Sequence, residues 1–165
     1  MRPILTFLLL IVLSVSLCSC PYISDVPLDD NPSSYINTDL IGTWRYENYP
    51  GDSTEISFSK KNEYEYNVEA TLPYQSTYAH YTFTGYFCHI KDGVLLNLKE
   101  SDGSNYVAAV WLNNRHLTIK ALSENVTDKQ FSTSSEFKAF VEKIYTNSTV
   151  KYDDETALND LQKVE

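Results

Sequence analysis

The sequence predicts a mainly β protein, with an antiparallel meander of strands closed into a small barrel and one amphipathic helix near the C-terminus. Between residues 39 and 123, apolar and polar residues alternate with a period of two, which is typical of strands with one buried face. Turn sequences separate these runs, and no helical pattern interrupts them. Closure into a barrel is favoured because it removes unpaired strand edges.

Residues 1–19 have the pattern of a targeting leader. Arg2 precedes an uncharged apolar run at residues 4–17, which suits a signal peptide and is shorter than the roughly 20 residues of a membrane-spanning helix. The run ends in Leu-Cys-Ser-Cys, which resembles the signal of bacterial lipoproteins, in which a small residue precedes the acylated cysteine. The resemblance implies that Cys20 carries the lipid, with palmitate or a similar acyl chain. A secreted protein without lipid is the alternative.

The lipoprotein resemblance implies a bacterial cell-envelope protein held on the lipid bilayer through acylated Cys20. Pro21 does not resemble the aspartate that retains such proteins at the inner membrane, so we expect the outer membrane. Cys18 leaves with the leader, and Cys88, in an apolar run, is expected to be a small buried residue. Without lipidation, a disulfide between Cys20 and Cys88 becomes the alternative.

Composition and periodicity divide the rest of the chain. The 165 residues carry a formal net charge of −9, which argues against nucleic acid as a partner and leaves a basic protein partner open. Residues 20–38, with three prolines and little periodicity, are expected to form a flexible tether. The barrel and helix are expected over residues 39–146, followed by an acidic polar tail over residues 147–165.

Seven strands are expected in hairpin succession, or eight if the long run at residues 77–90 divides at Gly85. That run is apolar on both faces, so both faces are expected to be covered unless Gly85 marks a bend or bulge. The expected strands cover residues 42–47, 53–59, 63–70, 77–90, 94–98, 106–112 and 117–122.

One helix is expected after residue 132. Thr133 and Glu136 have the spacing of a capping box. The apolar residues that follow recur at helical spacing and must pack on the sheet: Phe137, Phe140, Val141 and Ile144. In the tail, Leu158, Leu161 and Val164 allow a weak helical turn, with disorder as the alternative.

The first expected strand resembles the Gly-x-Trp opening of the lipocalin and calycin barrels, with Gly42 and Trp44 in the motif positions. The order of tether, meander and helix is similar as well, over residues 39–145. The resemblance implies that Trp44 plugs one end of the barrel. In that family an arginine after the last strand packs on this tryptophan. Here Lys120 and Lys129 are nearest to that place, and Arg115 precedes the last expected strand.

The sequence predicts no enzyme, metal site or cofactor. The histidines His80, His89 and His116 lack the spacing of metal ligands. Glu63, Glu65 and Glu69 share one face of an expected strand and are best explained as a solvated outer face. The sequence has no serine nucleophile elbow, phosphate loop or redox cysteine pair.

Two functions remain. In the first, a lipocalin-like barrel binds a small apolar or amphipathic ligand in its interior. In the second, the domain is an envelope protein-protein interaction module or inhibitor that uses an acidic, tyrosine-rich surface. The residues expected to line the ligand site are Tyr46, Phe58, Tyr64, Tyr66, Val94, Leu96, Tyr106 and Val110. The alternative is that the same residues fill the barrel as core.

Overall fold

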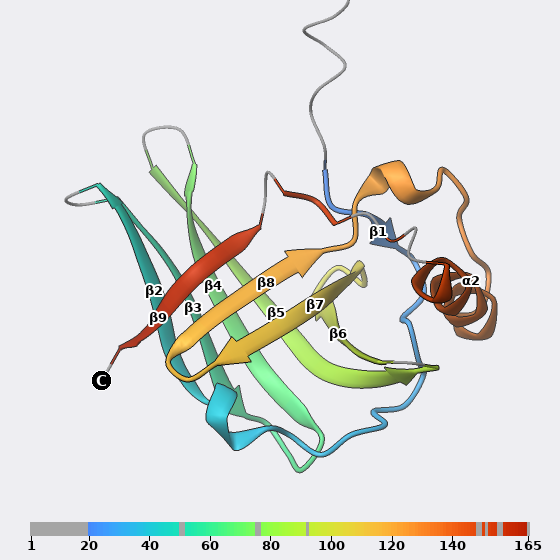
Figure 1. Cartoon of the computed structure of the whole chain (residues 1–165), viewed down its shortest axis with the longest axis horizontal. Coiled ribbons are helices and arrows are strands. Elements are labelled where there is room, and N and C mark those ends of the chain that lie inside the picture. The colour runs from blue at the N-terminus through green and yellow to red at the C-terminus, as the bar shows by residue number, and fades with distance from the viewer. Residues whose placement is uncertain are drawn as a thin grey trace, which may run out of the picture.

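A computed structural model describes residues 20–49, 52–74, 77–91, 93–147, 150, 152–154 and 157–164. The leader expected at residues 1–19 lies outside the described residues. Eight antiparallel strands close into a barrel, which confirms the predicted fold class (Figure 1). The strands are β2 (Gly42–Tyr49), β3 (Asp52–Lys60), β4 (Glu65–Tyr74), β5 (Thr77–Ile90), β6 (Gly93–Glu100), β7 (Asn105–Asn113), β8 (His116–Ala121) and β9 (Leu158–Val164).

The last strand comes from the tail and closes the barrel. Each strand from β2 to β8 pairs with its neighbours along the chain, and β9 lies between β8 and β2. The register places Lys163 opposite Trp44 and Leu161 opposite Leu117. The expectation of a helical turn or a disordered tail is therefore wrong for residues 158–164. Because Leu161 is fully buried among the barrel side chains, this strand is part of the core.

The barrel interior is packed with large side chains. Trp44, Phe58 and Tyr66 expose 2 % or less of their surface, so the middle of the barrel is filled. Gly85 faces this core from β5, and a Cβ atom there would lie 3.0 Å from Val68 Cγ2. The long run is thus one continuous strand whose glycine makes room for neighbouring side chains. The fully enclosed members of this cluster also include Leu40, Val68, Leu96, Leu117 and Leu161.

A second apolar cluster covers the outside of the barrel. Helix α2 (Ser134–Thr146) is capped by the hydroxyl of Thr133, which accepts the amide of Glu136 at 3.2 Å, as predicted. Phe137 and Val141 of this helix are buried against the outer faces of β5, β6 and β7. The strand residues in this cluster are Tyr86, Cys88, Ile90, Leu95, Val107 and Ala109. The outer face of β5 is therefore covered at Tyr86, Cys88 and Ile90, which explains why the second half of this strand is apolar on both faces.

Residues 20–38 pack along the barrel, so the expectation of a flexible tether is wrong. Strand β1 (Ile23–Ser24) pairs with β7. Tyr22 and Leu28 are buried in the outer cluster, and the Leu28 amide donates to Asn97 Oδ1 at 2.9 Å. The physical reason is that the outer faces of β5 to β7 are apolar and are covered jointly by α2 and this segment. The described residues also form two short 3-10 helices, η2 (Thr38–Leu40) and η3 (Glu124–Val126).

The barrel has two different ends. Strands β2, β4, β6 and β8 begin at the end where η2 lies, here called the closed end. The same strands finish at the opposite end, here called the open end, where inward-facing side chains are only half-buried. In Figure 1 the closed end lies at the bottom and the open end at the top.

Candidate functional site

The closed end is sealed by η2 and two aromatic residues. Trp44 is fully buried, and its indole Nε1 donates to the Leu40 carbonyl at 2.8 Å. The Tyr66 hydroxyl accepts the amide of Asn37 and is also fully buried. Burial is the main cause that raises the pKa of Tyr66, so this phenol stays protonated. Trp44 therefore lies buried at the end of the barrel where η2 packs.

A lysine from the last strand covers the tryptophan. The ammonium group of Lys163 lies 5.1 Å from the centre of the Trp44 ring and donates to the Asp39 carbonyl at 2.8 Å. Gly42 has a φ of 132°, and a Cβ atom there would lie 2.8 Å from Lys163 Cε. Sequence reasoning missed Lys163 because its strand was not recognised. The two lysines that the sequence offered as partners of Trp44 lie elsewhere. Lys120 pairs with Asp154, and Lys129 lies over Phe131.

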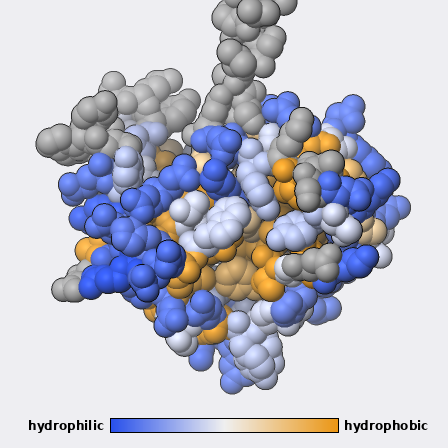
Figure 2. Space-filling view, viewed as in Figure 1, coloured by the Kyte–Doolittle hydropathy of each residue, from blue (hydrophilic) through white to orange (hydrophobic). Residues whose placement is uncertain are grey.

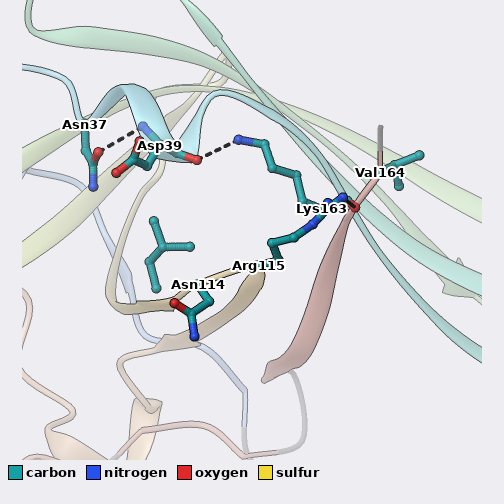
Figure 3. Close-up of a pocket in the computed structure, with 7 residues that line it drawn as sticks. Asn37, Asp39, Asn114, Arg115, Lys163 and Val164 are labelled. Atoms are coloured by element: carbon teal, nitrogen blue, oxygen red, sulfur yellow. Dashed lines mark hydrogen bonds between the residues drawn. The ribbon is translucent and has the colours of Figure 1, made fainter.

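A polar pocket of about 740 Å³ lies beside this plug, between η2, the β7–β8 turn and the end of β9 (Figure 3). Its cationic groups already have partners, since Lys163 bonds to Asp39 and the Arg115 guanidinium donates to the Lys163 carbonyl at 3.3 Å. Asn114 adopts a φ of 54° in the turn, the left-handed conformation that asparagine tolerates. The pocket is lined by Asn37, Asp39, Leu112, Asn114, Arg115, Lys163 and Val164.

The open end is lined by half-buried aromatic and aliphatic side chains. The rings of Tyr81 and Phe83 stack with centres 6.2 Å apart, and Tyr106 meets Phe83 edge-on at 5.8 Å. The Tyr106 hydroxyl donates to Glu100 Oε2 at 3.2 Å. Burial, followed by the charge of Glu100, raises the pKa of Tyr106 to about 12. Leu72 and Leu158 complete this half-buried lining on β4 and β9. The arrangement offers an apolar surface with one phenol–carboxylate pair.

The eight residues predicted to line a ligand site lie in three different environments. Phe58, Tyr66 and Leu96 belong to the filled middle of the barrel. Tyr106 and Val110 are half-buried against this core, Tyr106 in the aromatic lining of the open end. Tyr46, Tyr64 and Val94 are exposed, at 42 %, 37 % and 42 %. The alternation of side chains along the strands therefore identified the inward-facing residues in most cases. It did not show which of them lie in the filled middle of the barrel and which lie near its ends.

An exposed aromatic pair lies at the closed end. Tyr35 exposes 70 % of its surface and stacks on Tyr64, with ring centres 4.8 Å apart. Beside the pair, a shallow groove of about 410 Å³ includes the carboxylates of Glu63 and Glu65. The surface of the molecule is otherwise mixed. Figure 2 shows apolar residues exposed near the middle of one face and framed by hydrophilic ones.

The histidines lie apart from one another. His80 contacts Thr71 at 3.0 Å, His89 contacts Ser34 at 2.7 Å, and His116 contacts Asp160 at 2.6 Å. Among the described residues, no group of three or more histidine, cysteine, aspartate or glutamate side chains is arranged to hold a metal ion. Each histidine ring therefore has its own polar partner, and these contacts do not bring the three rings into a shared site.

The two cysteines in the described part of the chain are not joined in a disulfide. Cys20 is exposed, whereas Cys88 is fully buried in the outer cluster. Burial, followed by the charge of Asp29, raises the pKa of the Cys88 thiol to about 12. A thiol in this state is a poor nucleophile and serves as a small packing residue.

The fold and these surfaces define a closed antiparallel barrel with a sealed end and a half-exposed apolar end. No protein-family model matches the chain, and no curated protein and no solved structure matches it significantly. Within the described ranges, no helix is both long enough and apolar enough to cross a membrane.

Proposed function

We propose that this chain is a lipocalin-like lipoprotein of the bacterial envelope, anchored through acylated Cys20, that binds a small apolar or amphipathic ligand at the open end of its barrel. The observation that carries the ligand proposal is the inward-facing aromatic lining of Tyr81, Phe83 and Tyr106, which is half-buried rather than packed away. Such a lining with few polar groups is typical of sites for small apolar ligands.

The filled middle of the barrel limits the ligand. Because Trp44, Phe58 and Tyr66 occupy the interior up to the closed end, only the open half is available. The ligand would therefore be a short or partly inserted apolar group. The hydrogen-bonded pair of Tyr106 and Glu100 supplies a polar contact at the rim.

The ligand proposal is tested first by native mass spectrometry of the protein purified from its own host, which should show a co-purified lipid or other apolar molecule. An apolar fluorescent dye should then bind the protein. Tyr81→Asp should weaken this binding, because it places a charge in the apolar lining. The control is Thr82→Asp, because Thr82 is exposed on the outer face of the same strand. Equal dye binding by both variants, with no retained molecule, would remove the ligand proposal.

A second function is favoured by the Tyr35–Tyr64 pair. Exposed tyrosines beside carboxylates are suited to a basic protein partner, since aromatic residues are enriched at interfaces and the net charge is −9. In this case the domain is an envelope interaction module or inhibitor. Tyr35→Ala would weaken capture of the partner from envelope extracts, whereas Tyr78→Ala, at the other end of the barrel, would not.

A further inference from the structure

The N-terminal end of the described chain is fixed to the rim of the open end. The Cys20 carbonyl accepts the amide of Glu124 at 2.9 Å, and Pro21 forms a β-bridge with Ser123. The Tyr22 amide then donates to the Leu122 carbonyl at 2.6 Å. Three consecutive residues are thus held by the backbone that follows β8. Because β8 runs from the closed end to the open end, its continuation lies at the open rim (Figure 1).

This attachment restricts the distance and orientation that the barrel could take relative to Cys20. A flexible segment of residues 21–38 could span roughly 60 Å when extended, which would leave the barrel free to take any orientation. In the structure the same segment runs along the barrel, with Tyr22 and Leu28 buried. A lipid on Cys20 would therefore hold the open rim itself at the surface of the bilayer.

Exposed apolar side chains occur at the same end. Ile23 exposes 48 % of its surface and lies opposite Tyr106 in the register of β1 and β7. Tyr46, in the half of β2 toward the open end, exposes 42 %, and Tyr78 near the start of β5 exposes 39 %. Tyrosine is suited to the boundary between lipid and water because its ring is apolar and its hydroxyl is polar.

We propose that the open end of the barrel lies against the lipid bilayer that carries acylated Cys20, with Ile23, Tyr46 and Tyr78 at the headgroup level. The proposal rests on the lipoprotein function proposed above and adds an orientation to it. The apolar lining of the open end then faces the membrane, and the closed end, with the Tyr35–Tyr64 pair, faces the aqueous compartment. An apolar ligand could pass between the bilayer and the barrel without crossing water.

The test uses full-length acylated protein on phosphatidylcholine vesicles, with a nitroxide label on a single introduced cysteine. Tyr78→Cys places the label at the open end, and Lys60→Cys, at the exposed end of β3, places it at the closed end. Cys88 does not interfere because it is fully buried, and acylation occupies Cys20. We expect the label at position 78 to lose its accessibility to a water-soluble nickel chelate on the vesicles, while the label at position 60 keeps it.

The outcomes separate the orientation from the anchor. A chain of residues 21–165, which lacks the acylated cysteine, serves as control and should show no loss at either position. If intact mass confirms the acyl chains on Cys20, and either the label at position 60 loses its accessibility to the chelate or neither label does, the proposed orientation is wrong. The lipid anchor is correct in that case. If the mass shows no acyl chains on Cys20, the anchor and the orientation both fail.

Discussion

The side chain of Lys163 lies across the indole ring of Trp44, with its ammonium group 5.1 Å from the ring centre, and joins the last strand of the barrel to the first. The same ammonium group donates to the Asp39 carbonyl of η2 at 2.8 Å. One residue of β9 therefore holds the plug of the closed end in place.

Lys163→Ala should lower the free energy of unfolding by about 1–2 kcal/mol, because it removes a cation–π contact and a hydrogen bond. Urea denaturation would measure the change. Lys163→Arg should retain most of the stability, and Lys60→Ala on the exposed end of β3 should change it little. Equal effects of Lys163→Ala and Lys60→Ala would show that the contact with Trp44 is not stabilising.

Gly42→Ala should destabilise the barrel by about 1–3 kcal/mol, since alanine is strained at a φ of 132° and its Cβ would meet Lys163 Cε at 2.8 Å. Gly103→Ala is the matched control. Gly103 also has a positive φ, of 98°, but a Cβ there has nothing within 4 Å. The larger loss at position 42 in thermal or urea unfolding would report the close approach of Lys163. An equal loss of stability at both positions would show that backbone strain alone explains the effect.

Leu161→Ala should lower the free energy of unfolding by about 2–5 kcal/mol, because Leu161 is fully buried between β8 and β2. Its neighbour Gln162 is exposed, so Gln162→Ala should stay within about 0.5 kcal/mol of the parent. Urea denaturation of the two variants tests whether residues 158–164 belong to the core. A tail outside the barrel would make both substitutions neutral.

The stability of the domain should fall with pH above about 9 because of Cys88. The unfolded thiol deprotonates near its ordinary pKa of 9.0, whereas burial keeps the folded thiol protonated up to a pKa of about 12. The unfolded state therefore binds fewer protons between these values, and the free energy of unfolding decreases as the pH rises, by about 1.4 kcal/mol per pH unit at most.

The window from pH 9 to 10 separates this thiol from the tyrosines with raised pKa values, whose ordinary pKa is 10.0. Cys88→Ala should lower stability at neutral pH, where it leaves a small cavity, and flatten the slope within this window, so that the deficit of the variant shrinks as the pH rises. Urea titrations at several pH values would measure it. An unchanged slope in the variant would assign the pH dependence to other groups.

Cys20→Ala should abolish the incorporation of a radioactive or clickable fatty acid, because the acceptor thiol is lost. Cys18→Ala should leave incorporation intact, since Cys18 precedes the expected cleavage point. Labelling of both variants in their host, followed by gel analysis, would measure the effect. Incorporation that survives Cys20→Ala would overturn the anchor.

Much of the barrel could be predicted from local patterns. The hairpins from β2 to β8 follow from alternation and turn sequences, and Thr133 and Glu136 correctly mark the start of α2. The strand β9 was missed for a physical reason. Asp160 has a φ of 54°, and the pairing of β8 with β9 shifts at this point, so Leu158 and Leu161 face the barrel three residues apart instead of two. That spacing resembles a helical turn.

The site was harder to predict than the fold. The alternation of side chains placed Tyr46 and Val94 on the inward face, but both are exposed, Val94 at the start of β6 and Tyr46 in the half of β2 toward the open end. The covering of the outer face by residues 20–38 was missed because prolines suggest an extended linker. The sequence of β5 contained the signal that could have shown this covering. Its second half is apolar on both faces, and a strand buried on both faces requires a layer of chain outside the barrel.

The position of β9 has a consequence for the order of folding. Thr43 and Val164 are paired across almost the whole length of the domain, so this contact is among the least local in the molecule. Non-local strand pairs form slowly because a long loop must close first. Until they form, the edges of β2 and β8 are unpaired and can join other chains. We therefore expect closure by β9 to limit the folding rate, and the seven-stranded intermediate to be the species most prone to aggregation.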